Sequence, residues 1–226
     1  IRLHFLLEDN PSLSQRIIDR YKSMYTGVFY NRYILGEWCV AEGLVYDFGE
    51  DNIVDEVPSN GEYYISIDYG TMNPFSAGLW CVLGDKATRI KEYYYNGREK
   101  AVQRTDEDYC DSVEELAKGY NIRQIVVDPS AASFIAALRK RGFTIRKANN
   151  DVLDGIRRTA VYLKNGNIKI HRSCVDAIAE FGLYRWDDKA SADTVIKEND
   201  HAMDDIRYFC NTVMKNKVRK ESNYTP

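Results

Sequence analysis

Residues 63–71 read YYISIDYGT, an apolar, β-prone run that ends in Asp68 and is closed by Gly70. Residues 122–130 read IRQIVVDPS, a second apolar run that ends in Asp128. A short continuous run of large apolar residues is typical of a strand buried inside a sheet. The two runs therefore predict two buried strands, each with an aspartate at its carboxyl end.

A third acidic motif, DHAMDDIRYF, occupies residues 200–209 and is expected to form a helix that carries Asp204 and Asp205. Adjacent residues on a helix point about 100° apart, so only one of the two aspartates can be the main ligand from this helix. The apolar periodicity of the helix does not decide between them. His201 lies three residues before Asp204 on the same helical face, and it is a candidate to bind a metal, orient water or carry a proton.

The acidic residues together predict a divalent-metal site. Mg²⁺ and Mn²⁺ prefer oxygen ligands, and two such ions about 3.5–4 Å apart can clamp an in-line displacement at a phosphodiester. One ion activates the attacking water and the other stabilises the leaving oxygen. Asp68 and Asp128 would come from adjacent strand ends, and Asp204, with Asp205 as the alternative, would reach them from the helix. We therefore expect a nuclease rather than a binding domain.

The rest of the pattern predicts a mixed sheet with helices on its faces. Strand-like runs come first, and a tight turn joins the last two of them, at residues 63–68, 76–83 and 87–95. Helices and strands then alternate, as in a mixed α/β fold. We expect helices at residues 106–118, 131–141, 152–163, 175–184 and 202–214, and strands at residues 122–127, 143–146 and 167–171.

The first part of the chain is expected to be an appendage to this unit. Residues 12–24, SLSQRIIDRYKSM, predict a short helix. Residues 29–49 are rich in aromatics and broken by glycines, and we expect them to pack against the main domain or a neighbour. A turn cluster at residues 58–61 marks the boundary. Because the chain begins with Ile1 rather than Met, we interpret it as a fragment of a longer protein.

The composition is ordinary for a globular protein. The 226 residues are 44% hydrophobic and 29% charged, and no apolar run approaches the roughly 20 residues that a bilayer span requires. No signal peptide is visible in the N-terminal stretch. The five cysteines lack the spacing of a zinc or redox motif, which fits a reducing cytoplasm.

The charge balance argues mildly against a dedicated DNA-binding module, since the formal net charge is -3. Basic residues can still gather locally on a surface that meets nucleic acid. The candidate clusters are Arg139, Lys140 and Arg141; Arg146 and Lys147; Arg157 and Arg158; and the tail KNKVRK at residues 215–220.

The acidic motifs give the chain a resemblance to a known family. IDYGT with Asp68, VVDPS with Asp128 and NDHAMDDIRYF with Asp204 resemble the nuclease domain of the large terminase subunit of tailed double-stranded DNA bacteriophages. The resemblance runs over residues 63–209. In that family the aspartate three residues after the histidine is the metal ligand, which puts Asp204 ahead of Asp205.

The resemblance implies an α/β fold of the RNase H-like, resolvase/integrase type, with a mixed central sheet flanked by helices. It also implies an endonuclease that uses two Mg²⁺ or Mn²⁺ ions to cut concatemeric viral DNA during genome packaging. Asp68, Asp128, Asp204 and His201 would be catalytic. The implied partners are double-stranded DNA, the terminase small subunit and the portal of the procapsid, without a membrane, in the cytoplasm of the host cell.

The resemblance further implies a division of the chain. Residues 35–48, LGEWCVAEGLVYDF, are similar to the junction by which this family leaves its ATPase domain. Residues 1–57 would then be the linker and the end of the ATPase region, and residues 58–226 the nuclease domain. No G-x-x-x-x-G-K-[ST] phosphate loop occurs in the sequence, so the ATPase motor itself is not expected here.

Other classes remain open on the residues alone. Another RNase H-like nuclease, of resolvase or transposase type, would share the strand-end aspartates. An ATP-binding domain of the actin and sugar-kinase type also uses a phosphate loop that resembles IDYGT, but the glycine-rich loops that it needs besides are missing from this sequence. A docking module for DNA or capsid, with inactive acidic residues, is the third alternative. Metal-dependent nicking of plasmid DNA distinguishes these classes.

Overall fold

A seven-stranded mixed sheet forms the centre of the computed structural model, which describes residues 5–190 and 192–217. The strand order is β1-β7-β4-β3-β2-β5-β6, with antiparallel pairing of β2 with β3 and of β3 with β4, and parallel pairing elsewhere. The strands are β1 (Ile53–Val54), β2 (Glu62–Asp68), β3 (Phe75–Leu83), β4 (Lys86–Tyr95), β5 (Ile122–Val127), β6 (Ile145–Lys147) and β7 (Ile168–His171). The predicted mixed sheet is therefore confirmed.

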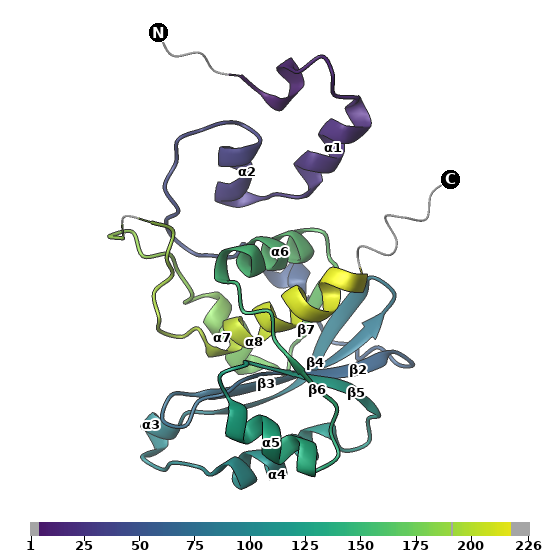
Figure 1. Ribbon diagram of the computed structural model, residues 1–226, viewed down its shortest axis with the longest axis vertical. Coiled ribbons are helices and arrows are strands. Elements are labelled where there is room, and N and C mark those ends of the chain that lie inside the picture. The colour runs from purple at the N-terminus through teal and green to yellow at the C-terminus, as the bar shows by residue number, and fades with distance from the viewer. Residues whose placement is uncertain (1–4, 191, 218–226) are drawn as a thin grey trace.

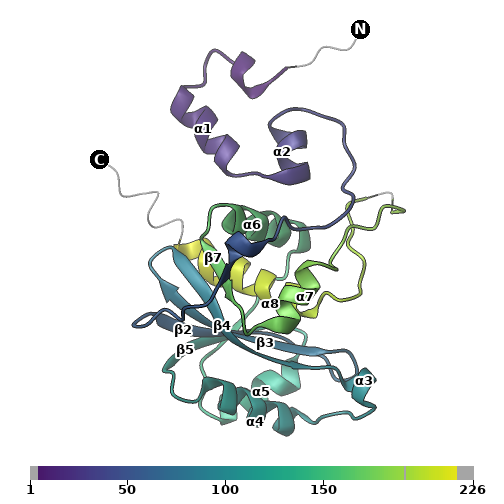
Figure 2. The ribbon, with the colours of Figure 1, turned by 180° about the vertical axis from the view of Figure 1, so that it is seen from behind.

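Helices cover both faces of this sheet (Figures 1 and 2). One face carries α6, α7 and α8, and the other carries α4 and α5, while α1 and α2 stand beyond α6. The helices are α1 (Gln15–Ser23), α2 (Gly27–Tyr33), α3 (Gly97–Lys100), α4 (Asp106–Ala117), α5 (Ala132–Lys140), α6 (Val152–Lys164), α7 (Val175–Phe181) and α8 (His201–Phe209). Short 3₁₀ turns occur at Leu7–Asp9 and Glu50–Asn52.

The alternation of side chains along β2 divides the core in two. Ile65 and Ile67 point into the apolar cluster under α4 and α5, whereas Tyr64 joins the cluster that contains α8. Ser66 lies on the same side as Tyr64 and is also fully buried. Its hydroxyl accepts a hydrogen bond from Trp80 Nε1 of β3 and donates one to Asp205 of α8, each at 2.8 Å.

The register of the central strands fixes where the strand-end aspartates lie. Strand β2 runs parallel to β5, and Ile67 is the partner of Val127. Asp68 and Asp128 each follow this pair by one residue, so both emerge at the same edge of the sheet. This juxtaposition is the one that the two apolar runs predicted.

Helix α8 lies across β2 and β3 and is buried over almost its whole length, since only His201 among its residues is partly exposed. The ring of Phe209 stacks on Trp80 of β3 at a centroid distance of 4.1 Å. The α-helix ends at Phe209 and continues as a π-helical turn, Cys210–Met214, in place of the single helix predicted over residues 202–214. Wider turns of this kind commonly occur beside functional sites.

Part of the N-terminal region belongs to the sheet domain. Strand β1 pairs with β7, and Phe48 stacks on Phe181 of α7 with ring centroids 4.0 Å apart. An isolated bridge joins Leu44 to Arg185. The short elements α2, α3 and β1 were not predicted, because each is too brief to produce a periodic pattern. The boundary at residue 57 stays a prediction, but these contacts cross it.

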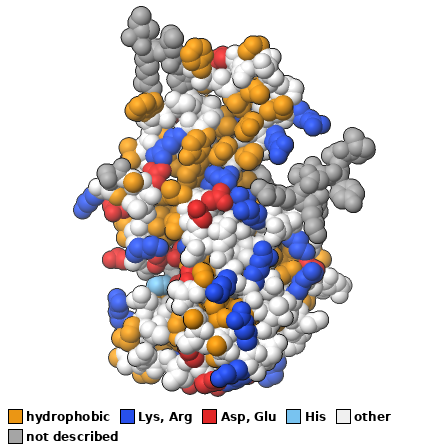
Figure 3. Space-filling model, viewed as in Figure 1, with side chains coloured by type: hydrophobic (Ala, Val, Ile, Leu, Met, Phe, Trp, Pro, Cys, Tyr) orange, Lys and Arg blue, Asp and Glu red, His pale blue; other side chains and the backbone are white. Residues whose placement is uncertain are grey.

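The outer part of the N-terminal region exposes many apolar side chains. In Figure 3 hydrophobic side chains form a nearly continuous area over the upper part of the molecule, where α1 and α2 lie. The exposed large side chains of this region are Phe5, Ile17, Tyr21, Met24, Tyr33, Trp38, Val40 and Leu44. Within residues 5–190 and 192–217, no helix combines the length and hydropathy that crossing a membrane requires.

Candidate active site

Asp68 and Asp128 approach one hydroxyl group at the edge of the sheet. Asp68 is the last residue of β2, and Asp128 follows β5 directly. The hydroxyl of Tyr208, from α8, donates to Asp128 Oδ2 at 3.0 Å and lies 3.4 Å from Asp68 Oδ1. The two predicted ligands are therefore brought to opposite sides of a single buried phenol.

Asp128 is held by the loop that follows it. The backbone N–H of Ser130 donates to Asp128 Oδ1 at 2.7 Å, which is the usual geometry of an aspartate at the start of a turn. Burial raises the pKa of Asp128, but hydrogen bonds from Ser130, Tyr208 and Asn150 outweigh it and lower the pKa below its ordinary value. The carboxylate form is thus the favoured one.

Asp68 forms a pair with His201, the first residue of α8. The ring Nδ1 of His201 lies 2.9 Å from Asp68 Oδ2. Burial raises the pKa of Asp68 to about 6, although the contact with His201 opposes this shift. Burial lowers the pKa of His201, but Asp68 and the nearby carboxylates of Asp200 and Glu180 raise it overall. The two groups therefore titrate as a coupled pair.

Asp204 lies in the first turn of α8, between two cations. Arg207 Nη2 is 2.9 Å from Asp204 Oδ1, and Lys197 Nζ is 3.6 Å from Asp204 Oδ2. Lys197 also lies 3.4 Å from Asp200 Oδ2. Asp204 keeps a narrow opening to solvent, being 8% exposed.

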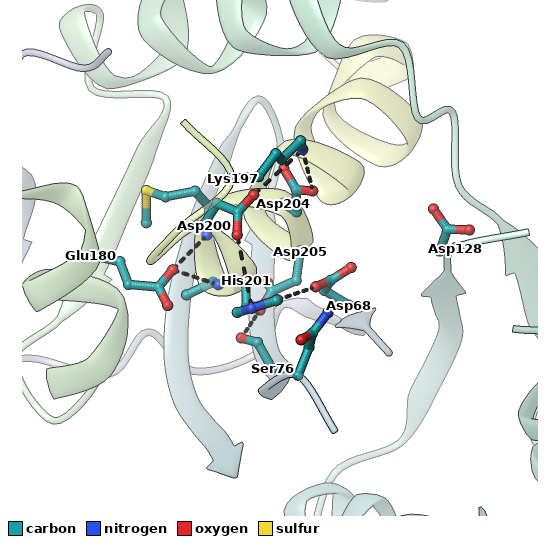
Figure 4. A network of polar contacts seen from close by, with 12 residues as sticks. Asp68, Ser76, Asp128, Glu180, Lys197, Asp200, His201, Asp204 and Asp205 are labelled. Atoms are coloured by element: carbon teal, nitrogen blue, oxygen red, sulfur yellow. Dashed lines mark hydrogen bonds and ion pairs between the residues drawn. The ribbon is translucent and has the colours of Figure 1, made fainter. Parts of the chain in front are cut away.

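A cavity of about 540 Å³ joins these groups, with Asp68, Lys197, Asp200, His201 and Asp204 in its wall. Figure 4 shows Asp68, His201 and Asp204 around this space and Asp128 set apart at the end of its own strand. A larger cavity, of about 1000 Å³, lies between residues 26–52 and α6, and none of the four predicted ligands lines it. We place the candidate site at the smaller cavity, because Asp68, His201 and Asp204 line it.

Asp205, the alternative third ligand, does not join this group. It is fully buried between α8 and the sheet, where Arg89 Nη1 lies 2.5 Å from its Oδ1 and Arg89 Nη2 lies 3.1 Å from its Oδ2. Ser66 donates to Oδ1 at 2.8 Å, and Ser76 donates to Oδ2. Both oxygens are therefore occupied by partners inside the core, and the adjacent aspartates face different surroundings.

Gly78 of β3 makes room for this buried ion pair. A Cβ at residue 78 would stand 1.8 Å from Arg89 Nη1, so any larger residue displaces the guanidinium. Arg89 is itself fully buried and also lies 3.4 Å from Glu92. A buried Arg requires a carboxylate partner, and Asp205 is the nearer of the two.

The donor set fits a hard divalent cation, because Asp68, Asp128 and Asp204 offer carboxylate oxygens. Among the residues that the structure describes, however, no three His, Cys, Asp or Glu side chains converge closely enough to hold a metal ion as they lie. Asp128 is the outlying member (Figure 4). The hydroxyl of Tyr208 contacts both Asp128 and Asp68. The carboxylates therefore suit a divalent cation chemically, and two of them lie at the same edge of the sheet. Their assignment as ligands stays a prediction.

Four residues at or beside the site were not given a role by the sequence. Tyr208 follows Asp204 by four residues and Arg207 follows it by three, so both lie near Asp204 on the helix. Helical spacing could have identified them. Lys197 lies outside regular structure, and no pattern in the sequence points to it. Arg89 is also invisible to sequence reasoning, since a charged residue in a strand is ordinarily expected to be exposed.

The basic clusters differ in how far they are neutralised. Arg141 pairs with Glu107, Asp111 and Glu114. Arg157 and Arg158 both pair with Asp154, and Lys217 of the tail pairs with Glu62. Arg219 and Lys220 lie outside the described residues.

Arg146 and Lys147 differ from these clusters. They are exposed on β6, next to the strand that ends at Asp128, and form no ion pair with any described residue. They are therefore the basic cluster most directly available beside the site.

Comparison with known proteins shows similarity to the large terminases of bacteriophages. It is 21% identical over 235 residues to the large subunit of the terminase of Escherichia phage T5, a match that covers 96% of this chain and 52% of that protein. The solved large terminase of a thermophilic bacteriophage, in complex with ADP, is 44% identical and has a TM-score of 0.87, over 94% of this chain and 55% of that one. The chain thus spans about half the length of these relatives. No protein-family model matches it.

Isolated nuclease domains have the same fold. The large terminase nuclease of thermophilic phage G20c, with bound cobalt, has a TM-score of 0.54 at 14% identity, over 76% of this chain and 87% of that one. The g2p nuclease domain of bacteriophage SPP1, with bound Mn, has a TM-score of 0.51 at 18% identity, over 69% of this chain and 92% of that one. The predicted RNase H-like architecture is therefore confirmed.

Proposed function

Since the chain is a homologue of the phage large terminases, we propose that it is their metal-dependent nuclease region, which cuts concatemeric double-stranded DNA during genome packaging. The observation that carries the proposal is the meeting of Asp68 and Asp128 at one sheet edge, with Asp204 of α8 beside them. The cobalt and Mn bound by the nuclease domains of G20c and SPP1 support the use of a divalent cation here.

Asp68, Asp128 and Asp204 are the residues that would hold the metal, with Mg²⁺ or Mn²⁺ as the ion and two ions as the expected number. A bound divalent cation supplies the charge that activates water and stabilises the leaving oxygen of a phosphodiester. The carboxylates are suited to this because two come from strand ends fixed by the sheet and one from a helix fixed by the core. Asp205 is excluded from our ligand set because its oxygens are taken by Arg89, Ser66 and Ser76.

His201 is proposed to orient Asp68 and to move a proton at the cavity. Its Nδ1 faces Asp68 Oδ2 at 2.9 Å, and its side chain lines the same cavity. A histidine beside a ligating carboxylate holds that carboxylate in one orientation. The other ring nitrogen, Nε2, lies 3.8 Å from Asp200 Oδ1 and is available to exchange a proton.

Double-stranded DNA is the proposed substrate, and Arg146 and Lys147 are proposed to contact its backbone. Both are exposed beside Asp128, and a cation next to the cutting site attracts the phosphates on either side of the scissile bond. Contacts of this kind position the duplex without selecting a sequence. We therefore expect little sequence preference from the nuclease region itself.

The partners and the division of the chain follow the same proposal. Residues 1–57 would be the linker and the end of an ATPase region, and residues 58–226 the nuclease domain. The exposed apolar side chains of residues 5–44 support a neighbouring domain that covers them. The terminase small subunit and the portal of the procapsid would be partners of the whole protein, in the cytoplasm of the host cell.

Plasmid cleavage tests the proposal. We expect the purified chain to nick and linearise supercoiled plasmid with Mn²⁺ or Mg²⁺, and to lose this activity with EDTA or after Asp68→Asn or Asp128→Asn. Arg146→Ala combined with Lys147→Ala should raise the DNA concentration needed for half-maximal cutting. The matched control is Arg157→Ala with Arg158→Ala, where both cations are already paired with Asp154. Cutting that survives Asp68→Asn and Asp128→Asn would contradict the proposal.

A further inference from the structure

Among residues 5–190 and 192–217, the hydroxyl of Tyr208 is the one group with hydrogen-bond contacts to both strand-end aspartates. It lies 3.0 Å from Asp128 Oδ2 and 3.4 Å from Asp68 Oδ1. The two carboxylates emerge from neighbouring parallel strands at one edge of the sheet, where like charges repel each other. A hydroxyl between them offsets part of that repulsion and fixes the direction in which each carboxylate points.

The ring that carries this hydroxyl is buried and is contacted by the side chain of Arg207. Tyr208 is 4% exposed, and the guanidinium of Arg207 lies over its ring at 4.8 Å. Arg207 is in turn held by Asp204 at 2.9 Å and by the carbonyl of Asn150 at 2.9 Å. Burial and these contacts together hold the phenol in place.

A continuous set of contacts thus links all the proposed ligands. It runs from Asp204 through Arg207 to the ring of Tyr208, and from its hydroxyl to Asp128 and Asp68. Asp128 does not line the cavity that contains Asp68 and Asp204. Tyr208 is the direct connection between Asp128 and the rest of the site.

We propose that Tyr208 is a positioning residue, whose hydroxyl sets Asp68 and Asp128 in the arrangement from which they bind a divalent cation. The inference rests on the proposed function, because it presumes that these aspartates are ligands. Hydrogen-bonding partners of metal ligands typically contribute a factor of about 10–100 to metal affinity. The contribution of Tyr208 comes from its hydroxyl alone, since the ring serves packing and the contact with Arg207.

Tyr208→Phe tests this role, because it removes one oxygen atom and keeps the ring. We expect Mn²⁺ affinity, measured by calorimetric titration of the whole chain after removal of metal with EDTA, to fall by about tenfold or more. The measurement needs no DNA and no cutting.

Tyr64→Phe is the matched control. Tyr64 of β2 does not line the cavity, and its hydroxyl also donates to a carboxylate, Glu62 Oε2, at 3.1 Å. It touches none of the three aspartates. Both variants lose one phenol–carboxylate hydrogen bond, so a purely structural role predicts similar falls in melting temperature and unchanged Mn²⁺ affinity for both. The positioning role predicts weakened Mn²⁺ binding in Tyr208→Phe only.

The outcomes separate the inference from its premise. If the unaltered chain binds Mn²⁺, Asp68→Asn abolishes that binding and Tyr208→Phe binds as tightly as the unaltered chain, the positioning role is wrong and the metal site stands. If Asp68→Asn and the unaltered chain bind Mn²⁺ equally, the proposed metal site itself is wrong.

Discussion

Asp204 and Asp205 illustrate how much the surroundings of a residue decide its role. Both are carboxylates on α8, and both are buried. Asp204 lies at a cavity with cations on its two oxygens, whereas Asp205 is enclosed by Arg89 and two serines. In the proposed site the first would exchange a partner for a metal ion, whereas the second would have to leave the core to do so.

Substitution by Asn should separate the two aspartates. Asp205→Asn leaves the buried Arg89 without its main counter-charge, and breaking such a pair costs about 3–5 kcal/mol of unfolding free energy. Asp204→Asn keeps an oxygen toward Arg207, so we expect a loss of roughly 1 kcal/mol together with loss of Mn²⁺ binding. Urea denaturation and calorimetric titration measure the two quantities. Intact Mn²⁺ binding in Asp204→Asn, with its loss in a folded Asp205→Asn, would reverse our assignment.

The sequence could predict the position of a side chain where a backbone rule applied. It could not do so where a residue distant in the sequence determined that position. Asp68 and Asp128 could be brought to one edge because parallel neighbouring strands end together. The choice between Asp204 and Asp205 depended on Arg89, which lies more than a hundred residues earlier in the chain. Periodicity could not resolve it, because almost all of α8 is buried and the helix has no clear polar face.

At the scale of elements, the ion pair of Arg89 and Asp205 fastens α8 to the sheet. Arg89 comes from β4, its guanidinium passes over Gly78 of β3, and Asp205 comes from α8. Three elements therefore meet at one buried charge pair. The rotation of α8 about its own axis is fixed by this pair, and so is the direction of Asp204.

Gly78→Ala should loosen this attachment. The added Cβ would stand 1.8 Å from Arg89 Nη1, so the guanidinium must move away from Asp205. Forcing extra volume into a packed core typically costs about 1–3 kcal/mol, and the weakened ion pair adds to this. Thermal and urea unfolding measure the loss. Gly49→Ala is the control, because nothing lies within 4 Å of its added Cβ, and a change within about 0.5 kcal/mol is expected. Equal stability of the two variants would show that Arg89 is not confined as described.

The N-terminus of α8 is capped from another helix. Glu180 of α7 accepts hydrogen bonds from the backbone N–H groups of Ala202 at 2.7 Å and of Met203 at 3.3 Å, and from the hydroxyl of Tyr94. The residue that precedes α8, Asp200, makes no side-chain cap of its own. A carboxylate at a helix N-terminus satisfies unpaired N–H groups there.

Glu180 should make stability depend on pH. Burial raises its pKa to about 7 from 4.5, although the hydrogen bonds from Tyr94 and the α8 backbone oppose this. Because the folded pKa is the higher one, the unfolded state releases its proton first as pH rises, so stability falls between about pH 4.5 and 7 and then levels off. The fall is about 3 kcal/mol. Glu180→Gln has no proton to lose at this position. The difference in unfolding free energy between Glu180→Gln and the unaltered chain should therefore grow by about 3 kcal/mol from pH 4.5 to 8, as measured by urea titration. Parallel pH curves for the two proteins would refute this.

Most elements were predictable from the sequence because each has a strong local pattern. Strands β2 to β5 and helices α4 to α8 fall within a few residues of their predicted bounds. The elements that escaped prediction are the two-residue β1, the short α3 and the glycine-initiated α2. Strand β1 exists because β7 offers an open edge, which is a property of the folded sheet and not of residues 53–54.

At the scale of the whole molecule, the N-terminal region divides into a part that belongs to the sheet domain and a part that stands away from it. Residues 41–57 supply the edge strand β1, the buried Tyr46 and the Phe48 ring stacked on Phe181. Helices α1 and α2 stand further out (Figures 1 and 2), but Phe29 of α2 is buried beside Trp186 and Arg32 of α2 pairs with Asp193. These contacts cross the proposed boundary at residue 57.

Truncation tests this boundary. A chain that begins at residue 25, which keeps α2 and its buried Phe29, should melt close to the full chain, whereas a chain that begins at residue 58 also loses the burial of Tyr46 and Phe48. Burying an aromatic side chain contributes about 1.5–3 kcal/mol, so the shorter chain should melt roughly 10 °C lower. Differential scanning calorimetry measures the shift. Equal melting temperatures would place the boundary at residue 57, as the turn cluster predicted.

The position of α8 along the chain has a consequence for protein synthesis. Strands β2 and β5 leave the ribosome before α8, so a growing chain can present Asp68 and Asp128 before Asp204 is synthesised. Tyr208, Arg207 and His201 arrive with the same helix. We expect the unfinished polypeptide not to cut nearby DNA, because α8 is synthesised only after all the strands of the sheet.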